Sequence, residues 1–297
     1  MCSPGSGRNT WRGARRCFRD RPRNSGATGP HWSPDGRQLV FHSNRNGNSD
    51  IYISDREGGN LRRLTDHAAE DLTRAWSPDG THILFQSTRD GSEQLYTIRV
   101  DGTGLRRVTT GSRNHGHGKW APGGGRIIFN ATLDPAATNE EVYEMNLDGS
   151  DVRKLTDHPL RDTYASISPD GARIAFRRVI VAPGFDGGLR LIAQNSESFS
   201  AGRDGSNPVN LTNSAAFDGW PDWSRDSEWI AFSSNRTGDF HVFVMRRDGT
   251  GIRQVTTAAG SFTKPIWSPD GRQIVCTRTL DGNVEVFIIN VGVLSQR

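Results

Sequence analysis

The chain has 297 residues, of which 33% are hydrophobic and 24% charged, and its formal net charge is +4. It contains no run of the roughly 18 apolar residues that a membrane-spanning helix needs, so we expect no membrane span. The three cysteines match no metal or redox spacing, and their odd number argues against a disulfide framework.

Positive charge is concentrated at the amino terminus. Residues 1–23 contain seven arginines and one acidic residue, whereas the remainder contains 30 basic and 32 acidic residues. No apolar segment of roughly 7 to 15 residues follows, so no signal peptide is visible. We interpret 1–29 as a basic, disordered tail. We do not expect it to bind nucleic acid, because three lysines against 34 arginines indicate codon bias rather than phosphate contacts.

After the tail, a five-residue motif recurs. Its first copy is Trp-Ser-Pro-Asp-Gly from Trp32, and further copies begin at 76, 120, 167, 223 and 267, in steps of 44, 44, 47, 56 and 44 residues. In Ser-Pro-Asp-Gly the proline and the glycine occupy positions that a type I turn prefers. A period near 44 is that of a four-stranded propeller blade. The sequence predicts an all-β fold, a six-bladed β-propeller of four-stranded antiparallel blades.

Each repeat shows the same order of strand and turn signals. An alternating apolar run ends in phenylalanine nine residues after the repeat start, although Cys276 takes that place in the sixth repeat and would fill it less. Next come a hairpin with glycine and a third strand with an aromatic residue. An Asp-Gly turn then leads to a polar fourth strand that ends in Leu-Thr or Val-Thr. The expected blades are 30–66, 67–110, 111–157, 158–213, 214–257 and 258–297.

Two repeats are irregular. In the fourth, the extra residues are predicted to form two loop insertions, at 182–188 and 195–200. The sixth ends without an outer strand. Propellers can close by borrowing a strand from the opposite terminus, and the repeat spacing places that strand near 17–21.

Arginines recur just before the hairpin glycine, with acidic residues a few positions downstream. We expect ion pairs across these hairpins. The arginines are Arg45, Arg89 and Arg236, and the expected acidic partners are Asp50, Glu93 and Asp239.

The repeat resembles a known family. The Trp-Ser-Pro-Asp-Gly cores, Ser-Asn-Arg at 43–45, the Asp-Ile-Tyr strand at 50–52 and the Leu-Thr endings are similar to the TolB-type propeller repeat, over 30–290. That repeat occurs in the periplasmic TolB protein of the Tol–Pal envelope system, in propeller domains of prolyl-oligopeptidase-like enzymes and in oligogalacturonate-lyase-like proteins. The resemblance implies a six-bladed propeller, a protein partner and a periplasmic location.

Function is expected at one mouth of the central channel, where the loops that join each outer strand to the next inner strand gather. The candidate partner-binding residues stand five or three positions before the repeat starts: Asp71, Thr73, His115, His117, Asp162, Tyr164, Asp218, Trp220 and Lys264. Carboxylates and imidazoles are suitable ligands for a cation. We favour hydrogen bonding to loop amides over metal coordination for the aspartate that repeats in this column. Aromatic rings at the mouth suit a peptide or a sugar ring. We predict no metal and no cofactor.

Enzyme signatures are absent from the sequence. There is no Gly-x-Ser-x-Gly nucleophile elbow and no phosphate-cradling loop before a helix. We therefore predict a non-catalytic, monomeric protein that binds a protein or peptide partner at the channel mouth, in the cell envelope. The alternative is a carbohydrate-active enzyme that resembles oligogalacturonate lyase, with a polar or metal site in the channel.

Overall fold

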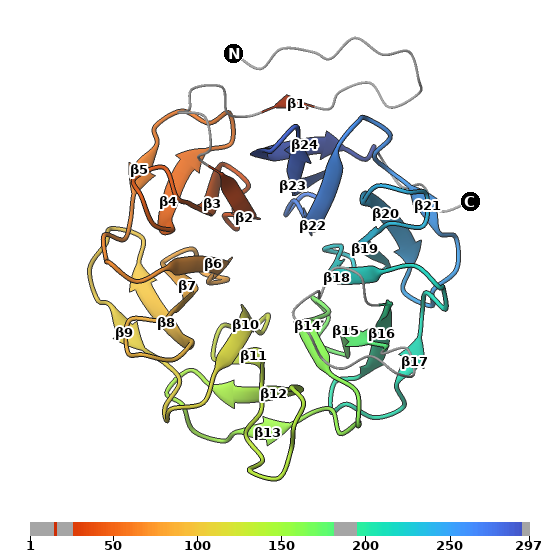
Figure 1. Cartoon of the computed structure of the whole chain (residues 1–297), viewed down its shortest axis with the longest axis horizontal. Coiled ribbons are helices and arrows are strands. Elements are labelled where there is room, and N and C mark those ends of the chain that lie inside the picture. Colours follow the sequence, from red (N-terminus) through yellow and green to blue (C-terminus); the bar gives the residue numbers. More distant parts are fainter. Residues whose placement is uncertain (1–14, 17–25, 181–194, 293–297) are drawn as a thin grey trace.

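The computed structural model describes residues 15–16, 26–180 and 195–292 as a ring of six four-stranded antiparallel sheets (Figure 1). In the first five blades the strands follow one another outward in chain order. The all-β, six-bladed propeller predicted from the repeat is thus confirmed. The described part of the chain contains no helix with the length and apolar character that a membrane crossing requires.

The strand bounds follow the repeat. Blade 1 contains β2 (Ala27–Trp32), β3 (Gln38–Ser43), β4 (Asp50–Asp55) and β5 (Arg62–Arg63). Blade 2 contains β6 (Asp71–Trp76), β7 (His82–Ser87), β8 (Gln94–Arg99) and β9 (Arg106–Arg107). Blade 3 contains β10 (His115–Trp120), β11 (Arg126–Ala131), β12 (Glu141–Asn146) and β13 (Arg153–Lys154).

The remaining blades have the same plan. Blade 4 contains β14 (Asp162–Ile167), β15 (Arg173–Val179), β16 (Ser196–Gly202) and β17 (Val209–Asn210). Blade 5 contains β18 (Asp218–Trp223), β19 (Trp229–Ser234), β20 (His241–Arg246) and β21 (Arg253–Gln254). Blade 6 contains β22 (Ser261–Trp267), β23 (Gln273–Leu280), β24 (Asn283–Asn290) and β1 (Arg15–Arg16).

The outer strand of blade 6 comes from the other end of the chain. Arg15 pairs with Ile288 and Arg16 with Phe287, so β1 covers the edge of β24 (Figure 1). The segment near 17–21, which the repeat spacing selects for this role, lies outside the described residues. An edge strand that is covered in this way presents no unpaired backbone groups over the paired positions.

Aromatic pairs fill the interior of each blade. Five second-strand phenylalanines are at most 1% exposed: Phe41, Phe85, Phe129, Phe176 and Phe232. Each stacks on a third-strand aromatic ring at a centroid distance of 5.6 to 6.0 Å. In blade 6, where Cys276 replaces the phenylalanine, the buried Phe262 packs on Phe287 at 5.5 Å and supplies ring volume from the inner strand.

The fourth blade corrects one prediction. Residues 196–202 form the third strand, β16, and Phe199 pairs with Phe176 as Tyr52 pairs with Phe41 in blade 1. The prediction of a loop at 195–200 is therefore wrong, and the extra residues of this repeat all fall between β15 and β16. The strand signal was missed because serines alternate with the larger residues, and these small hydroxyl side chains are buried without an apolar pattern.

Candidate binding pocket in the central channel

Every innermost strand carries a β-bulge near its middle. In β10, for example, the pairing with β11 shifts by one residue between Gly116 and Lys119, and the other five inner strands shift at the equivalent place. In five blades the residue three positions before the repeat start has a positive φ of 53° to 61°: Gly29, His117, Tyr164, Trp220 and Lys264. Bulky residues are rare in this region, and bulges of this kind redirect a side chain.

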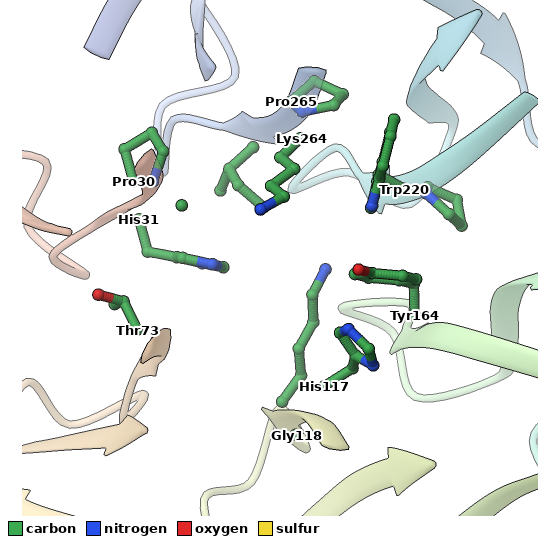
Figure 2. A pocket seen from close by; sticks show the side chains of 13 residues that line it. Pro30, His31, Thr73, His117, Gly118, Tyr164, Trp220, Lys264 and Pro265 are labelled. Atoms are coloured by element: carbon green, nitrogen blue, oxygen red, sulfur yellow. The ribbon is translucent and has the colours of Figure 1, made fainter. Parts of the chain in front are cut away.

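The redirected residues surround a pocket at the axis. A space at the axis that is open to solvent is lined by residues of all six inner strands. Figure 2 shows Tyr164 and Trp220 facing this space from one side, with His31 and Lys264 extending into it from the other. The lining consists of Gly29, Pro30, His31, Thr73, His117, Gly118, Lys119, Tyr164, Trp220, Pro221, Lys264, Pro265 and Ile266. Through the bulges, side chains of all six inner strands contribute to the lining of one pocket.

An aromatic cluster forms one wall. The rings of His117 and Tyr164 lie 3.7 Å apart, and Trp220 meets Tyr164 edge to face at 5.9 Å. Behind Trp220 lie Phe217, at 4.8 Å, and Phe240, at 5.9 Å. Because the rings support one another from blades 3, 4 and 5, this wall is preorganised rather than a set of separate mobile side chains.

An ion pair crosses the channel between blades that are not neighbours. Lys119 Nζ lies 2.9 Å from Asp222 Oδ1, joining β10 to β18. The second oxygen of Asp222 accepts a hydrogen bond from the backbone N–H of Trp267, also at 2.9 Å. Asp222 therefore ties blades 3, 5 and 6 together beside the pocket.

A second ring of polar side chains lies behind the bulges and holds three of them. These residues lie on the second strands, ten positions after each repeat start. Gln86 Oε1 accepts from His117 N at 3.3 Å, His42 Nδ1 from Thr73 N at 3.2 Å, and Thr277 Oγ1 from Gly29 N at 3.2 Å. This ring was not predicted, although its regular place directly after the phenylalanine column is a signal in the sequence.

His117 is oriented by a chain of hydrogen bonds. Asn130 Nδ2 donates to Glu140 Oε1 at 2.7 Å, which turns Asn130 Oδ1 toward His117 Nδ1 at 2.8 Å. Glu140 is in turn paired with Arg161 at 3.0 Å. His117 Nδ1 is thus the donor in this contact, and in the neutral imidazole the lone pair lies on Nε2.

Arg177 lies directly behind the aromatic wall. Its guanidinium carbon is 4.9 Å from the Tyr164 ring centroid and 5.4 Å from that of Phe217, and the residue is only 6% exposed. Burial lowers the pKa of this guanidinium. Its Nε has no hydrogen-bond partner among the described residues, and the Glu140 carboxylate that acts on it electrostatically is itself paired with Arg161. The wall therefore contains a buried positive charge.

The structure divides the candidate residues into two groups. Thr73, His117, Tyr164, Trp220 and Lys264 line the pocket, whereas Asp71, His115, Asp162 and Asp218 are buried inside the blades. The carboxylates bind arginines, in the pairs Asp71–Arg89, Asp162–Arg178 and Asp218–Arg236 at 2.7 to 2.9 Å. His115 packs on Phe129 at 5.6 Å, and its Nδ1 is 2.8 Å from Arg113 O.

These contacts also correct the arginine partners. Arg89 and Arg236 bind the inner-strand aspartates Asp71 and Asp218, so the expected pairs with Glu93 and Asp239 are wrong. Each guanidinium also stacks on the aromatic pair of its blade, as Arg89 does on Phe85 at 5.3 Å and Tyr96 at 5.0 Å. Asp50 is bound by Arg63 at 2.6 Å, and Arg45 stacks on Tyr52 at 4.7 Å. The aspartate column therefore anchors inner strands to blade cores.

The residues that line the pocket are poor ligands for a divalent metal ion. Among the described residues no group of three or more histidine, cysteine, aspartate or glutamate side chains converges as metal ligands do. The lining contributes two imidazoles and two ammonium groups, whereas hard divalent cations prefer carboxylate and carbonyl oxygens.

Comparison with known proteins identifies the family of the propeller. The family model of the TolB β-propeller domain matches residues 13–176 and 193–297. The chain belongs to the TolB β-propeller domain family. This TolB-like propeller is similar to TolB from Acinetobacter baumannii, with a TM-score of 0.68 and 19% identity over 82% of this chain and 57% of that one. It is also similar to oligogalacturonate lyase from Vibrio parahaemolyticus, with a TM-score of 0.64 and 11% identity over 100% and 98% of the two chains.

One curated protein matches over a short stretch. The uncharacterized peptidase YuxL of Bacillus subtilis is 54% identical over 41 residues, which are 14% of this TolB-like chain and 6% of the peptidase. The matched stretch thus covers 6% of that protein's length, and the chain covers 57% of the Acinetobacter TolB. The likeness to the Acinetobacter TolB and to the Vibrio lyase shows a shared propeller fold.

Proposed function

We propose that this TolB-like propeller is a non-catalytic, monomeric binding protein whose channel pocket holds a segment of a protein or peptide partner. The observation that carries the proposal is the ring of bulged inner-strand residues, four of them bulky, that turn toward the axis. Because the family includes TolB, the partner is sought in the cell envelope, with a periplasmic location.

Backbone energetics support a binding role. A non-glycine residue in the left-handed region costs about 1–2 kcal/mol, and such strain persists where it serves function. His117, Tyr164, Trp220 and Lys264 all adopt it at the same column. A repeat that only needed to pack could place glycine there, as blade 1 does with Gly29. Strained aromatic and basic residues at one mouth suit the anchor positions of a peptide.

The test is selection of peptides on the intact protein. A phage-displayed random peptide library is panned on the wild type, and the affinities of enriched peptides are measured by fluorescence anisotropy. We expect Trp220→Ala and Tyr164→Ala to weaken binding by about tenfold or more, as loss of an aromatic anchor does. Leu105→Ser, a matched change at an outer-rim residue that is 49% exposed, should leave the affinity unchanged.

Two results would reject peptide binding in the pocket. One is a library from which nothing is enriched on the wild type over the Trp220→Ala variant. The other is a set of enriched peptides that bind the Trp220→Ala and Tyr164→Ala variants as tightly as the wild type.

A carbohydrate-active enzyme that acts on an acidic sugar is the second candidate. The hydrogen-bonded chain from Glu140 through Asn130 to His117 favours it, because an oriented imidazole with its lone pair on Nε2 suits a general base. Incubation with trigalacturonate, followed by the absorbance of an unsaturated uronate product, decides between the two. Turnover that is lost in His117→Ala would replace the binding role with catalysis.

A further inference from the structure

The pocket lining is basic. It contains Lys119, Lys264 and two histidines, and no aspartate or glutamate stands among the described residues that line it. Lys119 is already paired with Asp222. Figure 2 shows the Lys264 side chain extending from β22 into the open space that Tyr164 also faces. A concave, partly apolar site lined by one sign of charge concentrates ligands of the opposite sign.

Two lining groups lack hydrogen-bond partners within the described residues. Trp220 Nε1 is buried and has none, and Thr73 Oγ1 has none although Thr73 is only 1% exposed. An indole N–H can only donate, so it can be satisfied only by an acceptor. A buried donor without an acceptor destabilises the folded protein, and a ligand oxygen would remove that penalty.

Arg177 adds a third indication. Its buried guanidinium stacks on Tyr164, and the Glu140 carboxylate that acts on it electrostatically is itself paired with Arg161. In a site of low polarity this charge acts on a ligand through the thin aromatic wall with little screening. An anion in the pocket would compensate it, whereas a cation would be repelled.

We propose that the group recognised in the channel pocket is a carboxylate of the bound peptide, with the Lys264 ammonium supplying the charge and the Trp220 indole N–H donating to a carboxylate oxygen. The aromatic wall of His117, Tyr164 and Trp220 then receives the apolar or aromatic side chain next to that carboxylate. This inference rests on the peptide-binding function proposed above and specifies its chemistry. It holds for a terminal carboxylate and for an acidic side chain alike.

The experiment compares probes that differ only in charge. Tryptophan fluorescence is titrated with N-acetylphenylalanine and with N-acetylphenylalaninamide. A second pair of blocked tripeptides, with phenylalanine on either side of aspartate or asparagine, separates a side-chain carboxylate from a terminal one. We expect one acidic probe to bind about tenfold more tightly than its amide, the usual advantage of a charge-assisted hydrogen bond.

Variants assign the preference to the named groups. Lys264→Met should reduce the acid-to-amide ratio to below about threefold while amide binding persists, and Lys264→Arg should keep the ratio. Trp220→Phe retains a ring but removes the N–H, and should weaken the acidic probe by about three- to tenfold. Lys154→Met, on the outer strand β13, is the matched control and should change nothing.

The outcomes separate the two proposals. Equal binding of acid and amide probes, both lost in Trp220→Ala, would reject carboxylate recognition and leave peptide binding intact. A preference that survives Lys264→Met would reject the assigned geometry. Binding of trigalacturonate in place of both probe pairs, or binding of no probe at all, would overturn this inference together with the proposed function.

Discussion

Arg177 shows how one residue can serve the pocket at a cost to the fold. A buried ion without a partner costs several kcal/mol of folding free energy, and each cation–π contact returns about 0.5–2 kcal/mol. Arg177 has two such contacts and no ion pair within the described residues. The balance is unfavourable for folding, so the guanidinium is better explained by what it offers a ligand.

Replacing Arg177 with methionine tests this balance. Methionine keeps much of the apolar stem and removes the charge, so we expect the variant to be about 1 kcal/mol more stable than the wild type. Urea unfolding at neutral pH measures the difference. In the wild type Arg173 Nε donates to Ser200 Oγ at 2.9 Å, so the comparison variant Arg173→Met should lose stability. A loss of more than about 1 kcal/mol in Arg177→Met would show that its charge is compensated.

The turn aspartates make a different contribution. Asp79 Oδ1 accepts from Ser77 Oγ, from Thr81 N and from Thr81 Oγ1, at 2.5, 3.0 and 2.8 Å. These bonds favour the carboxylate and lower the pKa of Asp79 to about 2. A depressed folded pKa stabilises the fold above the unfolded value, near 4, and the contribution is lost as the pH falls from about 4 to about 2.

We therefore expect a pH-dependent effect of Asp79→Ala. Because the side chain is exposed, solvent screening limits its contribution to about 1 kcal/mol at pH 7. Chemical unfolding of both proteins across the acid range should show this difference shrinking toward zero near pH 2. Glu70→Ala, at an exposed position with no hydrogen bond in the turn, should show no such trend. A gap that stays constant with pH would contradict the assignment to the carboxylate.

At the scale of elements, the blades interlock through the Asp-Gly turns between the third and fourth strands. A Cβ on Gly205 would lie 1.7 Å from the carbonyl oxygen of Leu155 in blade 3, and one on Gly249 would lie 2.8 Å from that of Leu211 in blade 4. Each turn therefore packs on the outer strand end of the preceding blade. Glycine is needed here for close approach as well as for its positive φ.

A matched pair of glycines separates these two requirements. Gly205 has a φ of 85° and Gly91 a φ of 89°, but an added Cβ on Gly91 would meet nothing within 4 Å. We expect Gly91→Ala to cost about 1–2 kcal/mol of backbone strain, and Gly205→Ala to cost at least about 2 kcal/mol more, because blades 3 and 4 must separate. Thermal unfolding measures both, and similar losses would show that blade contact at the turn is unimportant.

Features encoded by neighbouring residues were predictable from the sequence, whereas contacts between distant strands were not. The turn motif recurs in six repeats and the phenylalanine in five, and both signals are local, so strand order and blade number were predictable. The partner of Arg89 was not, because Asp71 lies on another strand and only the folded register brings them together. The side chains that line the channel depend on the bulges, which shift pairing without a sequence signature. Asn130 and Arg177 stand in a regular column directly after the phenylalanines, but the sequence does not show that this column contacts the bulged residues.

At the scale of the whole molecule, ring closure has two components. One is the pairing of β1 with β24. The other is packing between blades 1 and 6, where Phe41 and Tyr52 share a core cluster with Val275, Val286 and Ile288. A hydrogen bond from Arg56 to Gln273 Oε1, at 2.6 Å, also joins these blades. The second component does not depend on the amino-terminal segment.

Truncation separates these components. Removing residues 1–25 deletes β1 and uncovers the edge of β24, but it leaves the apolar contact between blades 1 and 6. We therefore expect a folded ring with reduced stability rather than an unfolded chain. A loss of about 2 kcal/mol would lower the melting temperature by roughly 4–8 °C in a domain of this size. Removing only residues 1–14 retains β1 and is the matched control, for which no change is expected. Equal melting temperatures for the two truncated proteins would show that the blade 1–blade 6 interface alone closes the ring.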